Sequence, residues 1–415
     1  LPAGCSVEVD EQTYFDGNDI AIQIDPAAIS GRVTWGAPSN ISILMNGSVS
    51  VASGASLTIR PGSVIKIAQN AFLAVDGELM ASGTEDNPIF FTETRDNSVG
   101  GALSGDGSLP EAGWWRSINI RNEGKAIFDW CTIAYAGRSD GAAILKSGAG
   151  SLRISNSVLS HTSGDGLRLS SGYSSFEHFQ NEYSYNTTGI RLGINASFAD
   201  VTTRFEGNST DIQLDGGAIT GTVSWGSNND YSMVITGDVS ISAGASLSIL
   251  PGTVIKFRQN NRILVYGSLE ALGEADLPIC FTDLRDDLVG GDANRDGGET
   301  TPAPGWWRSI GIMTDGTATF EHCVIRFAGY GDRSGVLKSS TGAVSMTDTV
   351  IEKVAGDGFR ADNAAGGVKI GRSTFSENSE AGLNCRTDGV SVEESVFLSN
   401  DTGVRTVANA SLILD

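Results

Sequence analysis

Basic residues, histidine and cysteine are all scarce in this sequence of 415 residues. There are 28 lysines and arginines against 49 aspartates and glutamates, which gives a formal net charge of −21. A surface this acidic repels phosphate backbones, so we expect no nucleic-acid partner, whereas divalent cations suit it. The three histidines lie far apart and the five cysteines form no CxxC pair. Neither a zinc site nor histidine-based triad chemistry is therefore expected.

Long apolar runs and helical patterning are lacking as well. No run of about 18 apolar residues occurs, so we expect no membrane-spanning segment. No apolar stripe with a period of about 3.6 residues persists along the chain. Ten prolines against 53 glycines are typical of a chain that turns every few residues. These features argue against a helical enzyme.

What the sequence does contain is an internal duplication. The segment ASLTIRPGSVIKIAQN (55–70) recurs as ASLSILPGTVIKFRQN (245–260), and AGWWRSINI (112–120) recurs as PGWWRSIGI (304–312). The two copies differ in length within the acidic, glycine-rich loops that precede the tryptophan pairs. A duplicated framework whose length varies only in a loop is typical of stacked modules.

The two ends of the chain also resemble one another. The segment 15–36 resembles 205–226, and 397–415 aligns with the start of that same segment. A coil at the end of a stack exposes unpaired backbone groups that seek a partner. We therefore expect that chains can stack end to end into a filament. The sequence predicts three parts, namely a first coil that resembles the tail of a preceding copy, a first copy and a second copy (1–31, 32–221 and 222–415).

Strand signals within each copy are short. SVSV, LTI, VIKI, FLAV, ELMA and IFFT alternate apolar with small or polar residues, and Gly, Asn or Asp separates them. A sandwich would show longer strands and hairpin turns. The spacing indicates coils of roughly 20–25 residues that add short strands to parallel sheets, which is an all-β parallel β-helix, or β-solenoid. Cys131 and Cys323 then lie on distant coils and are expected to be buried apolar groups without a disulfide.

The stretch LTIRPGSVIKIAQNAFLAVDGELMASGTEDNPIFFT, together with PGWWRSI after the acidic loop, carries a family resemblance. It resembles the repeated segment of bacterial secreted and cell-surface right-handed parallel β-helix proteins of the pectate-lyase-like superfamily, in a branch of uncharacterised surface proteins. The resemblance implies a right-handed helix and a secreted or cell-surface location. It does not imply an activity, because this fold carries lyases, hydrolases, adhesins and inert stalks alike.

The acidic loop of the second copy contains a candidate cation site. Asp292, Asn294 and Asp296 stand at alternate positions and are followed by Gly297. Oxygen donors at this spacing wrap a calcium ion, and glycine permits the sharp turn. We therefore expect calcium at this loop. The alternative is a solvated acidic loop whose glycines merely turn the chain.

The calcium pattern is incomplete in two respects. Ala303 occupies the position at which the helix-loop-helix calcium motif has a bidentate glutamate. The equivalent loop of the first copy keeps only Asp96, Asn97 and Asp106. Calcium is less expected at the first loop for this reason.

Paired tryptophans follow both loops, Trp114–Trp115 in the first copy and Trp306–Trp307 in the second. Exposed indoles stack on sugar rings, so these pairs are candidates for glycan binding. Adjacent residues of an extended chain point to opposite sides, however, so at most one of each pair faces outward. We favour core packing or loop anchoring.

Asp165 and Asp357 lie in the repeated GDG motif and are the candidate catalytic residues. Aspartates on such a sheet can serve as acid, base or calcium ligand. A hydrolase needs a second carboxylate, and a lyase needs a base with several cationic side chains nearby. Each motif offers no second carboxylate and only one cation, Arg168 three residues after Asp165 or Arg360 three residues after Asp357. Asp-Gly is also what a turn requires, and we favour that structural interpretation.

The preferred function is an extracellular structural or adhesive solenoid. The alternatives are a polysaccharide lyase or hydrolase and a non-catalytic glycan-binding module on the same fold. Seven Asn-X-Ser/Thr sequons add the question of glycosylation, which the sequence leaves open: Asn40, Asn46, Asn186, Asn195, Asn208, Asn400 and Asn409.

Overall fold

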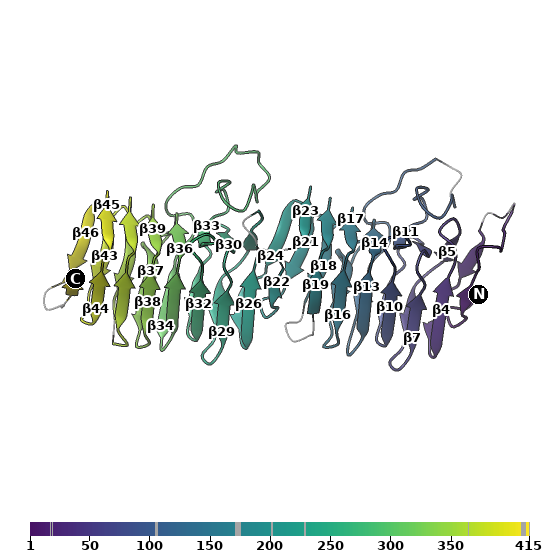
Figure 1. The fold of residues 1–415 in the computed structure, drawn as a ribbon, viewed down its shortest axis with the longest axis horizontal. Coiled ribbons are helices and arrows are strands. Elements are labelled where there is room, and N and C mark those ends of the chain that lie inside the picture. Colours follow the sequence, from purple (N-terminus) through teal and green to yellow (C-terminus); the bar gives the residue numbers. More distant parts are fainter. Residues whose placement is uncertain are drawn as a thin grey trace. The chain divides into compact units, whose positions relative to one another are not determined.

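The computed structural model describes residues 1–16, 18, 20–103, 107–170, 176–200, 202–227, 230–363, 365–407 and 412–414. Contacts divide the chain into two compact units. Unit 1 comprises Leu1–Arg191 and Thr202–Asp211, and unit 2 comprises Leu192–Val201 and Ile212–Asp415. Figure 1 shows strands and connecting loops. The described residues contain no helix, and hence none long and apolar enough to cross a membrane.

Unit 1 is a stack of coils in which successive strands enter three parallel sheets in turn. The seven-stranded sheet contains β1 (Val7–Glu8), β4 (Arg32–Gly36), β7 (Ser56–Ile59), β10 (Glu78–Ser82), β13 (Lys125–Asp129), β16 (Leu152–Ser155) and β19 (Phe176–Phe179). The eight-stranded sheet contains β2 (Ile22–Ile24), β5 (Ser42–Met45), β8 (Val64–Ile67), β11 (Ile89–Glu93), β14 (Cys131–Ala134), β17 (Val158–Ser160), β20 (Glu182–Ser184) and β23 (Arg204–Glu206). The third succession is β3 (Ala28–Ile29), β6 (Val49–Val51), β9 (Leu73–Val75), β12 (Ile118–Ile120), β15 (Ala142–Lys146), β18 (Asp165–Leu169) and β21 (Thr188–Leu192).

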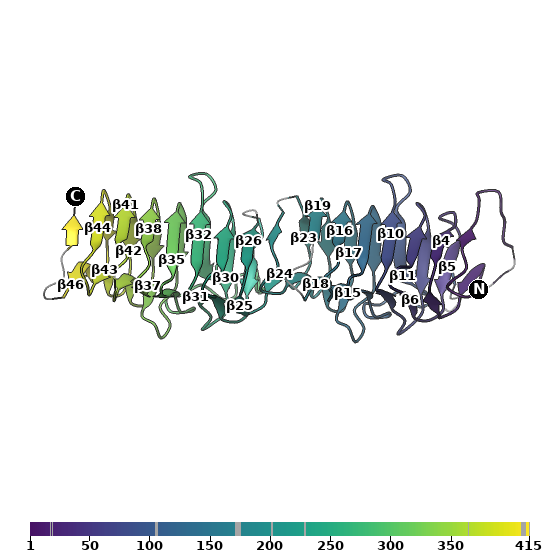
Figure 2. The same cartoon turned by 90° about the horizontal axis from the view of Figure 1, so that it is seen from below.

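Unit 2 has the same plan, and Figure 2 shows several of its strands side by side and pointing the same way. Its nine-stranded sheet contains β22 (Phe198–Ala199), β26 (Thr222–Gly226), β29 (Ser246–Ile249), β32 (Ser268–Leu272), β35 (Thr317–Glu321), β38 (Val344–Thr347), β41 (Val368–Gly371), β44 (Val390–Glu393) and β47 (Leu412–Leu414). Its eight-stranded sheet contains β25 (Gly217–Ile219), β28 (Val239–Ile241), β31 (Ile263–Val265), β34 (Ile310–Thr314), β37 (Ser334–Ser340), β40 (Asp357–Ala361), β43 (Ala381–Cys385) and β46 (Thr402–Thr406). The third succession is β24 (Thr210–Leu214), β27 (Met233–Ile235), β30 (Val254–Phe257), β33 (Ile279–Asp283), β36 (Cys323–Arg326), β39 (Val350–Glu352), β42 (Thr374–Ser376) and β45 (Val396–Leu398).

The core consists of columns of like side chains, one from each coil. In unit 1, Leu79 pairs in register with Leu57 on one side and with Ala126 on the other. In unit 2 the equivalent Leu269 pairs with Leu247 and with Ala318. All six side chains are buried. Stacking of this kind removes apolar surface from water at each coil, and the alternation of side chains along a strand sends every second residue inward.

The prediction of an all-β parallel solenoid is confirmed. All six of the predicted strands coincide with β6 to β11 of unit 1 within one or two residues. The repeated segments 55–70 and 245–260 have the same strands and the same burial patterns. The cysteines Cys131 and Cys323 are buried and free, as predicted.

Certain coil corners are made by one residue in the left-handed conformation. Tyr135, His161 and Tyr185 follow β14, β17 and β20 with φ values of 63°, 52° and 56°. Few non-glycine residues adopt such values, so this corner is a specific feature of the coil. The three rings lie above one another, with consecutive centroids 5.3 and 5.1 Å apart. The equivalent corners of unit 2 are Phe327, Lys353 and Glu377.

Candidate functional site

A long loop leaves the coils after β11 in unit 1 and after β33 in unit 2, and Figure 1 shows each loop standing off the strands of its own unit. The loop of unit 2 begins in a group of charged residues. The buried Asp283 carboxylate forms an ion pair with Arg285 at 2.6 Å. The Arg285 guanidinium lies over the Trp306 ring, 3.6 Å from its centroid. The backbone N–H of Ala303 donates to the same Asp283 carboxylate at 3.1 Å. Asp283 therefore joins the two ends of the loop.

The loop of unit 1 has an equivalent base. The buried Glu93 carboxylate accepts hydrogen bonds from Arg95 at 2.9 and 3.0 Å. The Arg95 guanidinium lies 3.7 Å from the centroid of the Trp114 ring. The backbone N–H of Glu111 donates to Glu93. Both loops are thus closed by an acid, an arginine and a tryptophan.

Three carboxylates approach one another within the loop of unit 2. Asp287, Asp292 and Asp296 each place one oxygen within 4.8 Å of the others, which is close enough for all three to contact one cation. Asp292 and Asp296 belong to the predicted calcium set. Asn294, the third predicted residue, donates its Nδ2 to Asp296 at 2.8 Å. The structure therefore brings the predicted residues together and adds Asp287 to them.

Several oxygens of this loop are buried without a hydrogen-bond partner. Within the described part of the chain, the Oδ1 atoms of Asp286, Asp287, Asp292 and Asn294 accept no hydrogen bond. The Asp286 side chain is fully buried. Buried polar atoms are nearly always satisfied, and unsatisfied acceptors grouped around carboxylates are what a bound cation satisfies. The unpartnered oxygens of Asp287 and Asp292 belong to the carboxylate cluster itself. Asp286 lies outside the cluster, and its other oxygen pairs with Arg326 and accepts from Thr282.

The electrostatics of the loop agree with this assignment. Burial raises the pKa of the Asp287 carboxyl above its ordinary value, and the Asp292 charge raises it further, against the opposing effect of the Lys256 ammonium. Hydrogen bonds from Thr300 lower the pKa of Asp296, so that this carboxylate stays ionised. A divalent cation would offset the repulsion among the carboxylates and favour their charged forms.

Asp287 was missed in the sequence because the calcium motif considered there places ligands at alternate positions. Asp287 lies five residues before Asp292, and the chain between them folds back. The run Asp286–Asp287, three residues after the end of β33, was the available signal. In the unit 1 loop, Asn97 and Ala102 occupy the positions of Asp287 and Asp292. Asp106, the equivalent of Asp296, lies outside the described residues.

The tryptophan pairs are divided between the core and the loop base. Trp115 and Trp307 are fully buried, and their indole N–H groups donate to backbone carbonyls at 2.9 and 2.8 Å. Trp307 stacks on Phe257 with ring centroids 4.2 Å apart. Trp114 and Trp306 are half-buried, each beneath an arginine. Of the four indoles, only those of Trp114 and Trp306 are therefore partly open to a sugar.

Asp165 and Asp357, the candidate catalytic residues, are both buried. Asp165 accepts a hydrogen bond from the Arg168 guanidinium at 2.5 Å. Asp357 accepts from the backbone N–H of Ala381 at 3.1 Å and from Asn384 Nδ2 at 2.8 Å. Both carboxylates thus have partners within the coils. Each is the first residue of a strand, β18 or β40, and not a turn residue.

Replacing Asp357 by asparagine is expected to destabilise unit 2 by about 1–3 kcal/mol, because one of its two buried donors would then face an NH2 group. Chemical denaturation monitored by far-UV circular dichroism measures the change. Asp401→Asn is the matched control, since its side chain is 70% exposed and lies near Arg405; it should change stability by less than about 0.5 kcal/mol. An Asp357→Asn variant of unchanged stability would contradict the structural role.

Two sequons are structural. Asn186 and Asn208 are buried, and their side-chain amides donate to backbone carbonyls of neighbouring coils at 2.9 and 2.8 Å. The Asn208 oxygen also accepts from the Asn186 backbone N–H. An amide engaged in this way is inaccessible to glycosylation in the folded chain. Asn409 lies outside the described residues.

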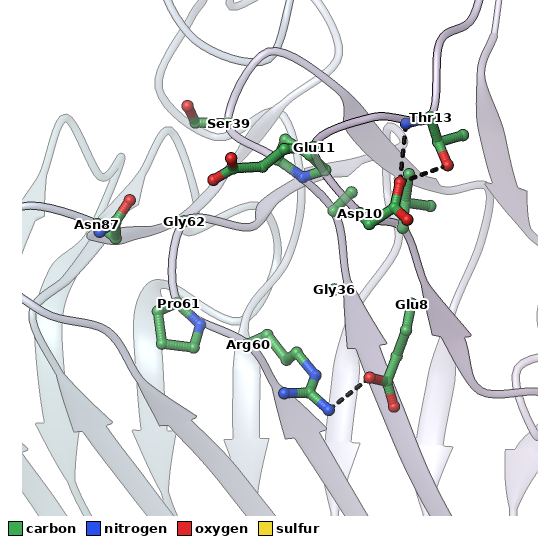
Figure 3. A pocket seen from close by; sticks show the side chains of 13 residues that line it. Glu8, Asp10, Glu11, Thr13, Gly36, Ser39, Arg60, Pro61, Gly62 and Asn87 are labelled. Carbon is green, nitrogen blue, oxygen red and sulfur yellow. Dashed lines mark hydrogen bonds and ion pairs between the residues drawn. The ribbon is translucent and has the colours of Figure 1, made fainter.

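Unit 1 also has an open pocket of about 560 Å³ near its first coil. Figure 3 shows the Glu8 carboxylate facing the Arg60 guanidinium and the Asp10 carboxylate facing Thr13. The Glu8 and Asp10 carboxylates are therefore engaged within the protein, and Glu11 is the third acidic residue that lines the pocket. Nothing in this pocket indicates a particular ligand.

Comparisons of the chain with protein-family models, with curated proteins and with solved structures gave no match.

Proposed function

We propose that this protein is an extracellular structural or adhesive solenoid. The observation that carries the proposal is that the inside of each unit is filled with packed side chains. The candidate catalytic residues Asp165 and Asp357 are buried, and their carboxylates are engaged by groups of the protein itself. A stack of this kind presents long, regular outer faces to other molecules. The excess of acidic residues keeps such surfaces soluble. The secreted or cell-surface location and the pectate-lyase-like resemblance belong to this proposal and are predictions.

The proposal includes a calcium ion in the loop of unit 2. Asp287, Asp292 and Asp296 supply carboxylate oxygens, and Asn294 supplies an amide oxygen. Calcium prefers six to eight oxygen ligands in a flexible arrangement, and it tolerates a loop that moves to meet it. Magnesium demands a smaller and more regular set. Bound calcium would stabilise the loop in the conformation that the structure shows.

End-to-end association of copies is the finer part of the proposal. In the described residues of unit 2, β45 is the last strand of its sheet. Val396 and Leu398 of this strand are 46% and 52% exposed. An edge strand with exposed apolar side chains is a template for pairing. The similarity of 397–415 to 205–226 and to 15–36 points to the first coil of a second copy as its partner.

Electron microscopy of the 415-residue chain at rising concentration, with calcium and with a chelator, tests the association. Particles longer than one copy, growing with concentration, are expected. Monomeric particles in every condition would remove end-to-end association and leave the scaffold proposal standing.

The scaffold proposal itself is tested by incubation with acidic and neutral polysaccharides. No sugar products should be released, and a glycan array with Trp306→Ala as control separates an adhesive surface from an inert one. Release of oligosaccharides that depends on Asp165 or Asp357 would contradict the proposal and favour a lyase or hydrolase.

A further inference from the structure

One outer corner of unit 1 forms a pocket that none of the sites above uses. Trp130, Asn156 and Gln180 stand one or two residues before β14, β17 and β20, with φ values of 49°, 50° and 54°. Glu182 of β20 and Arg204 of β23 are register partners in the adjoining sheet. These five residues are among those that line a pocket of about 350 Å³.

The backbone conformation does not explain why a tryptophan stands at this corner. A positive φ is uncommon for bulky residues, whereas asparagine and aspartate tolerate it best. The Trp130 side chain is half-buried. Of the seven tryptophans, all of which the structure describes, only Trp130 has neither a hydrogen bond from its indole nor an arginine over its ring. Its indole is therefore a partly open aromatic surface.

The polar side chains of this pocket have unused donors and acceptors. Asn156 Nδ2 donates to Asp129 Oδ1 at 2.8 Å, which leaves the Asn156 carbonyl oxygen as an acceptor. Within the described part of the chain, the side chains of Gln180, Glu182 and Arg204 form no hydrogen bond and no ion pair. A few free polar groups beside an apolar surface are what orients a bound small molecule.

The charges of the pocket favour an uncharged ligand. Glu182 and Arg204 are the only charged residues that line it, and they have opposite signs. The net charge of −21 on the chain disfavours an anionic ligand. A pyranose ring has the required chemistry, because its C–H groups can lie on an indole while its hydroxyl groups bond to amide, carboxylate and guanidinium groups.

The equivalent corner of unit 2 is different. Its three corner residues, which also have positive φ values, are His322, Asp348 and Arg372. The Arg372 guanidinium donates to both oxygens of Asp348, at 2.9 and 2.6 Å, so these two side chains satisfy one another. Thr374 and Val396 replace the acid and the base of the pocket. The open aromatic ring and the free polar groups are thus features of the unit 1 corner.

We infer that this corner of unit 1 binds an uncharged glycan, with one pyranose ring stacked on Trp130 and its hydroxyl groups bonded to the polar side chains of the pocket. This inference rests on the adhesive part of the proposed function and names the class of ligand. It assigns glycan binding to a corner of the coils and not to the tryptophan pairs that follow the two loops.

A glycan array, followed by isothermal titration calorimetry with the oligosaccharide that binds best, tests the inference on the intact chain. Neutral hexose oligosaccharides should bind in preference to uronic acid oligosaccharides. Trp130→Ala should weaken binding by at least about 10-fold, as truncation of an aromatic anchor commonly does. Trp130→Phe should weaken it less, because an aromatic face remains. Trp306→Ala should bind like the wild type.

Two further variants leave the Trp130 ring in place. Gln180→Ala and Glu182→Ala should each weaken binding by about 2- to 10-fold, the effect of one lost hydrogen bond. Far-UV circular dichroism and thermal unfolding should be unchanged in both, because neither side chain has a partner among the described residues. Glu177→Ala is the matched control, since Glu177 is an exposed acid of the same unit outside the pocket, and it should preserve affinity.

The outcomes separate this inference from the proposed function. Absence of binding to every neutral glycan would overturn the inference and leave the structural solenoid standing. Binding that survives Trp130→Ala would also overturn it, and loss of binding in Trp306→Ala would assign the ligand to the base of the unit 2 loop instead. A preference for uronic acid oligosaccharides would contradict the uncharged ligand. Release of sugar products would contradict the proposed function itself.

Discussion

Replacing Trp307 by alanine is expected to destabilise unit 2 by about 3–5 kcal/mol, the usual cost of removing a buried tryptophan side chain. The indole is fully buried, stacks on Phe257 with the two rings 6° from parallel, and donates to the Arg326 carbonyl at 2.8 Å. Truncation would leave a large cavity between the coils and an unpaired carbonyl. Urea unfolding monitored by circular dichroism measures the loss of stability, and amide hydrogen exchange in β30 and β36 measures its local effect.

Trp306→Ala is the matched control for this prediction. Its indole is half-buried under Arg285 and donates to the Phe257 carbonyl at 3.0 Å. We expect a smaller loss of stability, about 1–2 kcal/mol, since less apolar surface is returned to water. The order of the two effects would be reversed if the adjacent indoles faced the opposite way.

Replacing Lys66 by methionine is expected to release the loop of unit 1. The variant loses two charge-assisted hydrogen bonds, to Asp96 and Gly101, each contributing about 1.5–3 kcal/mol. Amide hydrogen exchange across residues 94–103 should accelerate by at least about 10-fold. Global stability should change less, because the cost of burying an ammonium group disappears as well.

Lys146→Met provides the control in the same unit. Lys146 is also fully buried, but its ammonium donates to the Gly148 carbonyl at a coil turn and not to the loop. The loop exchange of this variant should match the wild type. Unchanged loop exchange in Lys66→Met would show that the lysine does not anchor the loop.

The Lys66 pKa also predicts a pH dependence. Burial lowers the pKa of Lys66 in the folded chain, and the Asp96 charge opposes this shift. Between the lowered pKa and the ordinary lysine value, the unfolded chain binds more protons than the folded chain. The contribution of Lys66 to stability therefore rises as pH rises through this interval. The Lys66→Met variant should lack that part of the rise.

Much of the fold could be predicted because the pattern is local. The alternation in VIKI and its repeat correctly places Ile65 and Ile67 inward and Lys66 outward. The same pattern says nothing of the burial of Lys66, which arises because a loop from later in the chain covers the sheet. Coverage of an outer face is a tertiary effect that strand periodicity does not encode.

The candidate site was predictable in part for the same reason. Asp292 and Asp296 were found from spacing within one loop, and the structure brings them together. Asp287 joins them because residues 288–291 fold back over β30, which neither a spacing rule nor a composition count reveals. The burial of Trp307 and the partial cover of Trp306 by Arg285 likewise depend on contacts between distant segments.

Disulfide crosslinking of residues on neighbouring strands tests the central claim. The claim is that each unit is a stack of parallel coils, and that the strands of neighbouring coils pair in the same register in both units. Thr58 pairs with Met80 in unit 1, and Ser248 pairs with Glu270 at the equivalent position in unit 2. Neighbouring strands lie about 4.8 Å apart, within the range that a disulfide spans. In a Cys5→Ser background, both cysteine pairs should crosslink on mild oxidation, and Thr58→Cys with Ile127→Cys, two coils apart, should not. Crosslinking in only one unit, or of the two-coil pair in preference to its neighbours, would contradict the account.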